Sequence, residues 1–255
     1  MLPRVTWHFT GPLALWPSSA RCRVVRRATS QDLQLRRLFI LPEFNPHAKS
    51  RTTANKLERI LVVGSGVTNG RFSQSGGAEE LAWVKRQRLG VLVTELGGGG
   101  LAPQRILAEM QKHNWVHLAC EISQNTLHPL LSAIYLPNGK VSLEAIMSVP
   151  RRDGGTIFML RSSEVAQSYI VQGESLPFAH GMIMAGYSAI ITALWSLRAQ
   201  DASAVTQQVY ARLRHGENRE DVRVAQVLHA AVGHLRAEVG EKAFVRWVPY
   251  IHVGQ

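Results

Sequence analysis

Trp115-Val116-His117-Leu118-Ala119-Cys120 is a short apolar run that is followed directly by an acid, Glu121. A continuous run of this length predicts a strand that is buried on both faces, as in the parallel sheet of an α/β protein. The glutamate that closes the strand is the informative departure from this pattern. Its interpretation decides whether the chain is an enzyme or only the framework of one.

Outward from this strand, short apolar runs alternate with helix-length periodic segments. Further strands are predicted at residues 60–63, 91–96, 156–160, 187–194 and 247–253, and helices at residues 78–87, 103–112, 176–185, 201–214 and 221–239. Asp201 is the expected cap of the helix that begins there. This alternation predicts an α/β fold, with a largely parallel sheet flanked by helices on both faces.

Two local signals place a smaller motif between these elements. Asn138-Gly139 predicts a tight turn, because Asn-Gly accepts the positive φ angles of a type I′ turn, and it joins strands at residues 133–136 and 140–141. Ser142 follows as the N-cap of a short helix that extends to Met147.

The composition restricts the class of protein. The chain has 255 residues, 45% of them hydrophobic, which is enough for one good-sized core. Its net charge of +11 suggests nucleic acid or an anionic membrane surface as a partner. Most of this charge lies in residues 1–59, with eleven basic and three acidic residues, which leaves 18 basic and 15 acidic residues for the rest. Because the folded part of the chain carries no stripe of basic residues, we expect no nucleic-acid partner.

The two cysteines, Cys22 and Cys120, are too few for a disulfide framework or a thiolate metal site, which favours a reducing compartment. No apolar run reaches the ~18 to 20 residues of a membrane span. The glycine-rich residues 64–66 and 97–100 lack the spacing of phosphate-binding loops. We therefore expect no cofactor, no metal and no membrane span, and a cytoplasmic location.

The start of the chain differs from the rest. Residues 1–56 are predicted to be a basic, poorly ordered N-terminal extension before a domain at residues 57–255, with a candidate strand only at residues 37–41. Residues 1–31 contain five arginines and no acid, a composition compatible with a mitochondrial leader, although Pro3, Pro12 and Pro17 would interrupt its helix. A weak secretory core at residues 9–16 and a disordered leader are the alternatives.

Four segments in fixed order, at residues 107–121, 176–196, 201–202 and 244–254, together resemble one family. They include Ala-Cys-Glu at residues 119–121, Ala-Leu-Trp-Ser at residues 193–196 and Phe-Val-Arg-Trp at residues 244–247. The match resembles the CHAT domain in its fungal form, a caspase-like cysteine peptidase module often found behind tetratricopeptide repeats. It covers about residues 57–254, and no repeat array precedes it in this sequence.

The resemblance implies a caspase-hemoglobinase fold, a three-layer sandwich with a catalytic His at the end of one strand and a nucleophilic Cys at the end of the next. The family's first motif resembles His-x-x-Cys-His, and the position of its last His, the base, holds Glu121 here. The second motif resembles Leu-Ser-Ala-Cys-Gln-Thr. A count back from Gly181 without gaps places the nucleophile position at Ser162, so both catalytic positions are substituted.

The chemistry of these two residues agrees with a loss of peptidase activity. A serine hydroxyl is harder to ionise than a thiol, so Ser162 would need a base more than a cysteine would. A glutamate carboxylate is a weaker base than imidazole unless burial raises its pKa, which disfavours a dyad of Ser162 with Glu121.

Other residues are poor substitutes for the missing pair. Cys120 should point to the opposite face of its strand from His117 and Glu121, as a small core residue, and His117 lies ~13 Å from position 121 along an extended strand. His180 is interpreted as a packed structural histidine, and His128 as a loop residue. In the family an acidic residue often precedes the Asp matched by Asp201, whereas residues 197–200 contain none.

Three hypotheses follow from the sequence. The first is a catalytically inactive CHAT-type protein that acts as an interaction or regulatory module and binds a protein or peptide of unknown identity. The second is an active hydrolase that uses Ser162 or Ser163 with an unconventional base. The third is binding of nucleic acid or a membrane surface through the basic extension. The sequence does not predict an oligomeric state.

Overall fold

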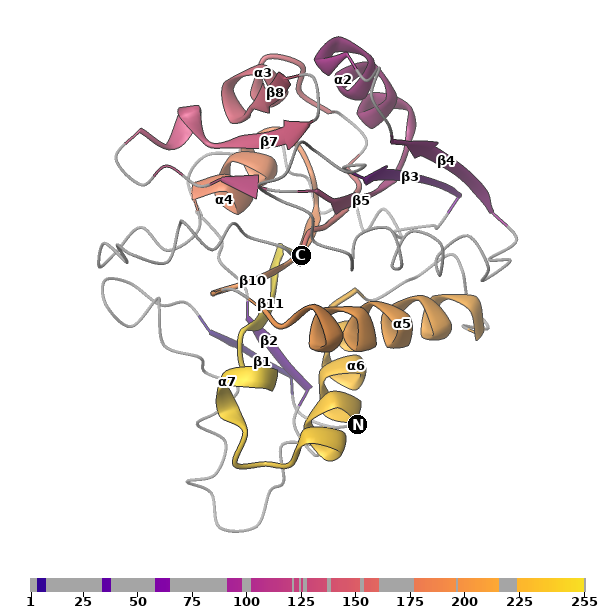
Figure 1. Ribbon diagram of the computed structural model, residues 1–255, viewed down its shortest axis with the longest axis vertical. Helices are drawn as coiled ribbons and strands as arrows, with labels where there is room; N and C mark the ends of the chain where they lie inside the picture. The colour runs from indigo at the N-terminus through magenta and orange to yellow at the C-terminus, as the bar shows by residue number, and fades with distance from the viewer. Residues whose placement is uncertain are drawn as a thin grey trace.

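The computed structural model describes residues 4–7, 34–37, 58–64, 91–97, 102–120, 122–123, 125, 128–136, 139–151, 154–160, 177–195, 197–215 and 224–254. A six-stranded central sheet organises them (Figure 1). Its strands are β3 (Arg59–Gly64), β4 (Leu92–Leu96), β5 (Trp115–Ala119), β9 (Thr156–Phe158), β10 (Ala189–Ala193) and β11 (Tyr250–Gly254).

The strand order in this sheet is β11-β10-β9-β5-β3-β4. Strands β4, β3, β5, β9 and β10 are parallel to one another, and only β11 at the end of the sheet runs antiparallel, against β10. This confirms the predicted largely parallel sheet and its strands at residues 60–63, 91–96, 115–120, 156–160 and 187–194. The carboxyl ends of the five parallel strands consequently lie at one edge of the sheet, called here the carboxyl edge.

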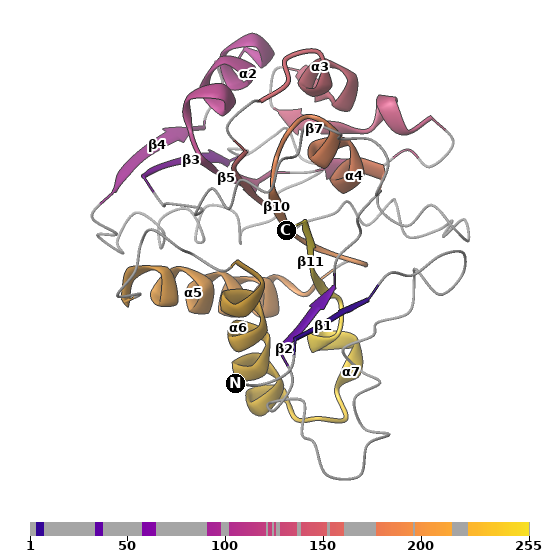
Figure 2. The same ribbon diagram turned by 180° about the vertical axis from the view of Figure 1, so that it is seen from behind.

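Helices cover both faces of the central sheet, so the fold has three layers (Figures 1 and 2). One layer holds α2 (Pro103–Lys112), α3 (Leu143–Met147) and α4 (Pro177–Met184), and the other holds α5 (Ala199–His215), α6 (Val224–Val239) and α7 (Phe244–Trp247). The helices predicted at residues 103–112, 176–185, 201–214 and 221–239 are thereby confirmed. The helix predicted at residues 78–87 lies outside the described residues.

The inner strands β3, β5, β9 and β10 are buried on both faces because their side chains alternate between two apolar clusters. On β3, Leu61 and Val63 belong to the cluster beneath α2 and α4, whereas Ile60 and Val62 belong to the cluster beneath α5 and α6. All four are fully buried. Continuous apolar runs in the sequence are therefore the sign of a sheet between two helical layers.

A second, smaller sheet lies beside the layer of α3 and α4. It contains β6 (Ile122–Ser123), β7 (Ala133–Leu136) and β8 (Gly139–Ser142), and β7 pairs antiparallel with β8 as the predicted hairpin. A short 3₁₀ helix, η3 (Pro129–Leu131), precedes β7. The hydroxyl oxygen of Ser142 accepts a hydrogen bond from the backbone N–H of Ala145 at 3.2 Å, which confirms Ser142 as the N-cap of α3.

Two predictions in the C-terminal half are wrong. Residues 247–253 are not one strand, because Trp247 closes α7 and the strand begins only at Tyr250. Pro249 separates the two elements, since it cannot donate to a ladder or continue the helical turn. Asp201 is not the cap of its helix, because α5 begins at Ala199 and places Asp201 inside the first turn.

Two short strands of the N-terminal segment are described. They are β1 (Arg4–Trp7) and β2 (Gln34–Arg37), which pair in parallel, and β2 lies against α6 and β11. Of the strand predicted at residues 37–41, Arg37 is the last residue of β2, and residues 38–41 lie outside the described residues. The division of the chain at residue 57 stays a prediction.

Candidate functional site

The candidate site is the carboxyl edge of the central sheet, where β5 and β9 end side by side. In an open parallel sheet, ligands bind outside the carboxyl ends of the strands, near the point where strand order reverses. Here β3 has β4 on one side and β5 on the other, so the reversal lies between β3 and β5, one strand away from the pair of β5 and β9. Trp115, Val116 and His117 pair in register with Thr156, Ile157 and Phe158.

The two positions predicted from the sequence, Glu121 and Ser162, lie outside the described residues, as does Ser163. After β5 the last residue that the structure describes before position 121 is Cys120, and after β9 it is Leu160. Both of these last residues are buried, at 2% and 3% exposure. The described residues therefore border the candidate site but do not include its two central side chains.

Cys120 and His117 lie on opposite faces of β5, as the alternation predicts. Cys120 belongs to the apolar cluster beneath α2 and α4 and forms no disulfide. His117 faces α5 and stacks on Phe158, with ring centroids 4.7 Å apart. Its Nδ1 lies 2.8 Å from the hydroxyl of Tyr210 on α5. The predicted role of Cys120 as a small core residue agrees with this placement. The predicted separation of His117 from position 121 stays a prediction, because that position lies outside the described residues.

The two other histidines considered from the sequence lie in α4 and just before η3. His180 lies in α4 and is half-buried, and burial lowers the pKa of its imidazole. His128 is exposed just before η3, and its backbone N–H donates to Oδ1 of Asn125 at 2.8 Å. Both placements agree with the structural and loop roles that were predicted for them.

A partly buried ion pair lies at the same edge and was not predicted from the sequence. Asp201, 3% exposed in the first turn of α5, accepts hydrogen bonds from Nε and Nη2 of Arg246 on α7, at 2.9 and 2.6 Å. This bidentate bond raises the pKa of Arg246 above its usual value. Both residues lie in segments that carried the family resemblance, and their opposite charges were the available signal.

The ion pair is part of a link between the end of β10 and the start of β11. The Leu194 N–H donates to the carbonyl of Pro249 at 3.0 Å, and the Trp195 indole donates to the carbonyl of Val245 at 3.1 Å. Because β11 runs antiparallel to β10, its first residue, Tyr250, lies opposite Ala193 at the carboxyl edge. The α7 segment is therefore held next to the candidate site by three sets of hydrogen bonds.

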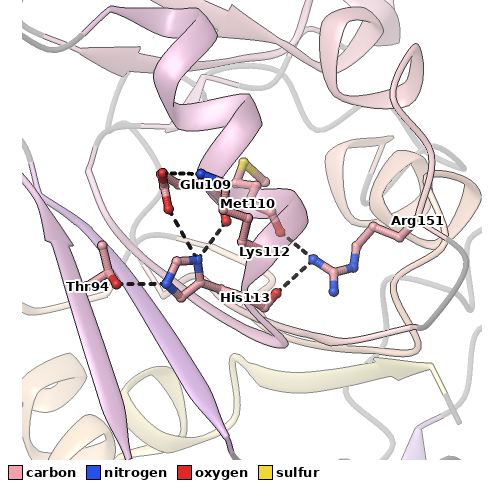
Figure 3. Close-up of polar contacts among 6 residues, drawn as sticks. All are labelled: Thr94, Glu109, Met110, Lys112, His113 and Arg151. Atoms are coloured by element: carbon pink, nitrogen blue, oxygen red, sulfur yellow. Dashed lines mark hydrogen bonds and ion pairs between the residues drawn. The ribbon is translucent and has the colours of Figure 1, made fainter.

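A second polar network lies where α2 ends and β5 begins, at the other end of β5 from the candidate site (Figure 3). Nδ1 of the buried His113 bonds to the Glu109 carbonyl at 2.7 Å, and its Nε2 lies 2.8 Å from the hydroxyl of Thr94 on β4. Glu109 also accepts from Lys112 at 2.9 Å, which is the main reason that the pKa of Glu109 lies below its usual value.

Arg151 completes this network from the segment between α3 and β9. Its side chain is buried, and its guanidinium donates to the carbonyl oxygens of Met110 and His113 (Figure 3). It also donates to the carbonyl oxygen of Gly154. Two of these carbonyls lie at the C-terminal end of α2, where a positive charge is favoured. No periodicity in the sequence distinguishes this arginine from an exposed one, so it could not be recognised beforehand.

Within the described ranges, the acidic residues, histidines and cysteines form no group of three or more that could hold a metal ion. Among the described helices, none combines the length and the apolar character that a membrane crossing requires.

The fold and the site's position define a class of protein: an α/β domain with a six-stranded, mostly parallel sheet and a site at the carboxyl edge. The family model described as "CHAT domain" matches residues 2–255, and the chain belongs to the CHAT domain family. No curated protein matches the sequence.

Solved structures place the fold among caspase-like peptidases. The chain is similar to the Arg-specific cysteine proteinase gingipain R, with a TM-score of 0.57 at 9% identity, over 88% of this chain and 54% of that one. A complex of Porphyromonas gingivalis pro- and mature gingipain domains gives a TM-score of 0.52 at 10% identity, over 80% and 49%. Separase in the Saccharomyces cerevisiae separase–securin complex gives 0.53 at 12% identity, over 78% of this chain and 12% of that one. The chain thus spans about half of the gingipain chains and a small part of separase.

Proposed function

We propose that this chain is a CHAT-family protein without the family's His–Cys chemistry, which acts as an interaction or regulatory module. The observation that carries the proposal is the pair of residues at the two expected catalytic positions, Glu121 and Ser162. A carboxylate in place of imidazole and a hydroxyl in place of a thiol weaken both the base and the nucleophile.

The strand register supports the choice of these two positions. Trp115 of β5 pairs with Thr156 of β9 in a parallel register. Glu121 lies six residues after Trp115, and Ser162 lies six residues after Thr156. The count that identified Ser162 started from Gly181, in a different segment. The equal spacing from a register pair is consistent with the count from Gly181, and this supports the choice of these two residues.

The described residues near these positions offer no ready replacement for the dyad. Cys120 is buried on the face opposite to His117, so its thiol and that imidazole cannot meet across β5. The imidazole of His117 is already bonded to Tyr210 inside the apolar cluster. Within the described part of the carboxyl edge, Asp201 is bonded to Arg246.

We expect the partner to be a protein or an extended peptide that binds at the carboxyl edge. The family's scaffold provides a surface there for a peptide, and this surface does not need the dyad in order to bind. Separase, one of the similar structures, is seen in a complex with the protein securin. Cytoplasmic location also stays part of the proposal.

The first experiment tests the absence of catalysis. The full chain and its Ser162→Ala variant are incubated with a peptide-substrate library and, separately, with a serine-reactive phosphonate. We expect no turnover and no labelling that distinguishes the two proteins. Turnover or labelling that is present in the wild type and lost in Ser162→Ala would favour the alternative function, an active hydrolase in which Ser162 works with an unconventional base such as Glu121.

The second experiment tests binding. Peptides are selected from a displayed library on the immobilised full chain, and the amide hydrogen exchange of the chain is compared with and without a selected peptide. Protection is expected at residues 118–120 and 159–160, at the ends of β5 and β9. Protection confined to the amino ends of these strands, near His113 and Arg151, would contradict the proposed surface.

A further inference from the structure

A buried polar cluster lies between α5 and the first half of β5, the strand that leads to the carboxyl edge. Trp115 and His117 are two residues apart on β5 and so project from the same face of the strand. The Trp115 indole N–H donates to the Tyr210 hydroxyl at 3.0 Å, and the same hydroxyl lies 2.8 Å from Nδ1 of His117. All three side chains are at most 1% exposed. One phenol thus contacts two side chains of the strand that leads to position 121.

The donors and acceptors in this cluster can be assigned from their chemistry. An indole N–H only donates, so the Tyr210 oxygen is the acceptor from Trp115. The hydroxyl can at the same time donate its hydrogen to Nδ1 of His117. In this assignment Nδ1 of His117 carries no hydrogen.

The cluster also joins β9 to the same helix. The Phe158 ring stacks on one side of His117, with centroids 4.7 Å apart and an interplanar angle of 22°, and the Tyr210 ring lies 5.7 Å away at 24°. Phe158 and Tyr210 are themselves 5.8 Å apart. Since Phe158 pairs with His117 across the two strands, the cluster fixes β5 and β9 relative to each other.

We propose that Tyr210 is a positioning residue for the candidate site: its hydroxyl bond to His117 holds the carboxyl end of β5 in place beside β9. Glu121 follows His117 by four residues, and Ser162 follows Phe158 by four. The proposal depends on the proposed function in one respect, the ligand that residues 121 and 162 would bind. The holding of the strand end is independent of it.

Cys120 provides a local reporter for this strand end. It lies three residues after His117, is 2% exposed, and shares the chain with only one other cysteine, Cys22. In a full chain with Cys22→Ser, the rate at which a thiol reagent labels Cys120 reports local opening of β5. Each rate is divided by the rate in urea-unfolded protein at the same pH, which cancels the intrinsic reactivity of the thiol.

Tyr210→Phe should raise this normalised rate about tenfold or more, because two buried polar groups lose their shared partner while the ring is retained. Tyr250→Phe, at a buried tyrosine on β11, is the matched control and should leave the rate close to the parent's. His117→Leu should open the strand end as Tyr210→Phe does. His117→Asn, whose amide oxygen can accept from the Tyr210 hydroxyl, should recover a substantial part of the protection.

Equal labelling of Tyr210→Phe and Tyr250→Phe would overturn the proposal, as would rates that follow global urea stability in every variant. A second measurement holds even if Tyr210→Phe does not fold. The imidazole ¹⁵N chemical shifts of the wild type should show an unprotonated Nδ1 on His117, and a protonated Nδ1 would equally exclude the assigned bond. Discovery of serine hydrolase activity would remove the proposed function and leave these outcomes unchanged.

Discussion

Arg151 shows how one buried cation can organise several segments. Its guanidinium reaches carbonyls of α2 and of the turn before β9, and its carbon Cζ lies 5.1 Å from the ring centroid of Tyr187. The chain around it is correspondingly tight. Gly186 has φ +97°, and a side chain there would collide with the Arg151 carbonyl. A residue that the sequence leaves inconspicuous is therefore central to the amino end of the sheet.

Replacement of Arg151 by Met should lower the free energy of unfolding by about 2–4 kcal/mol, because buried carbonyl acceptors would lose a charged donor. Urea denaturation followed by circular dichroism measures the change. Arg105→Met, on the exposed side of α2, is the control and should change the stability by no more than about 0.5 kcal/mol. Similar losses in the two variants would mean that the carbonyls find other partners.

His180 gives the chain a pH-dependent contribution to stability. Burial lowers the pKa of its imidazole in the folded state, so the unfolded chain takes up the proton first as the pH falls. The stabilisation is therefore present above the ordinary histidine pKa of about 6.5 and is lost below it. We expect His180→Gln to lose less stability than the wild type between about pH 7 and pH 5.

The comparison requires urea unfolding curves at several pH values for both proteins, so that the other histidines cancel in the difference. His128→Gln is the matched control, because that side chain is exposed, and it should retain the wild-type pH dependence. Parallel curves for the wild type and His180→Gln would contradict the predicted role of burial.

At the scale of elements, α3 and α4 pack closely because Gly181 has no side chain. A methyl group at this position would come within 2.7 Å of Cγ of Leu143. Gly181→Ala should therefore destabilise the fold by about 1–3 kcal/mol through overpacking, although alanine favours the helix itself. Leu143→Ala should cost about 2–5 kcal/mol, since Leu143 is 1% exposed.

The double variant distinguishes the packing explanation from a backbone effect. If the collision causes the loss, the added methyl group partly fills the space that Leu143→Ala leaves, and the double variant is more stable than the sum of the two losses predicts. Additive losses measured by thermal or urea unfolding would show that Gly181 is needed for another reason. Gly233→Ala, on α6 with open space around it, is the control.

The ion pair of Asp201 and Arg246 connects α5 to α7 at the carboxyl edge. Asp201→Asn removes the charge and should expose residues 244–248 to faster amide exchange and lower the thermal midpoint, because the carboxylate is buried. Glu241→Gln, which removes the exposed pair with Arg236, should change little. Equal amide exchange rates of α7 in the two variants would show that the hydrogen bonds from Leu194 and Trp195 are sufficient to hold this helix.

Sequence patterns predicted the elements that are buried on both faces better than those that depend on distant contacts. The runs in β3, β5 and β10 are recognisable because two helical layers require apolar residues at every position. The end of the chain was harder to predict. Trp247 was assigned to a strand, but its indole donates to the Glu241 carbonyl and its backbone belongs to α7. Tyr210 gave no signal, because its partners lie 93 and 95 residues away.

For the whole molecule, the family and the largely parallel sheet agree with the sequence-based expectation. The proposed chemistry at the carboxyl edge depends on two positions. The resemblance identified Glu121 and Ser162 by counting along motifs, and each lies outside the described residues, four positions after the register pair His117 and Phe158. The scaffold below them is well packed, with Phe158, His117 and Tyr210 in one cluster. If the framework has kept its geometry, the loss of activity should be a property of these two side chains alone.

This can be tested by restoring the missing groups. In the full chain with Cys22→Ser, Glu121→His combined with Ser162→Cys should react with a peptidyl warhead at least about tenfold faster than Ser162→Cys alone, because a neighbouring imidazole favours the thiolate. Glu121→Gln combined with Ser162→Cys removes the acid without supplying a base, and should stay slow. The thiol of Cys120 contributes little background, since it is buried. Mass spectrometry locates the label, and equal rates in the His- and Gln-containing variants would show that the two positions are not neighbours.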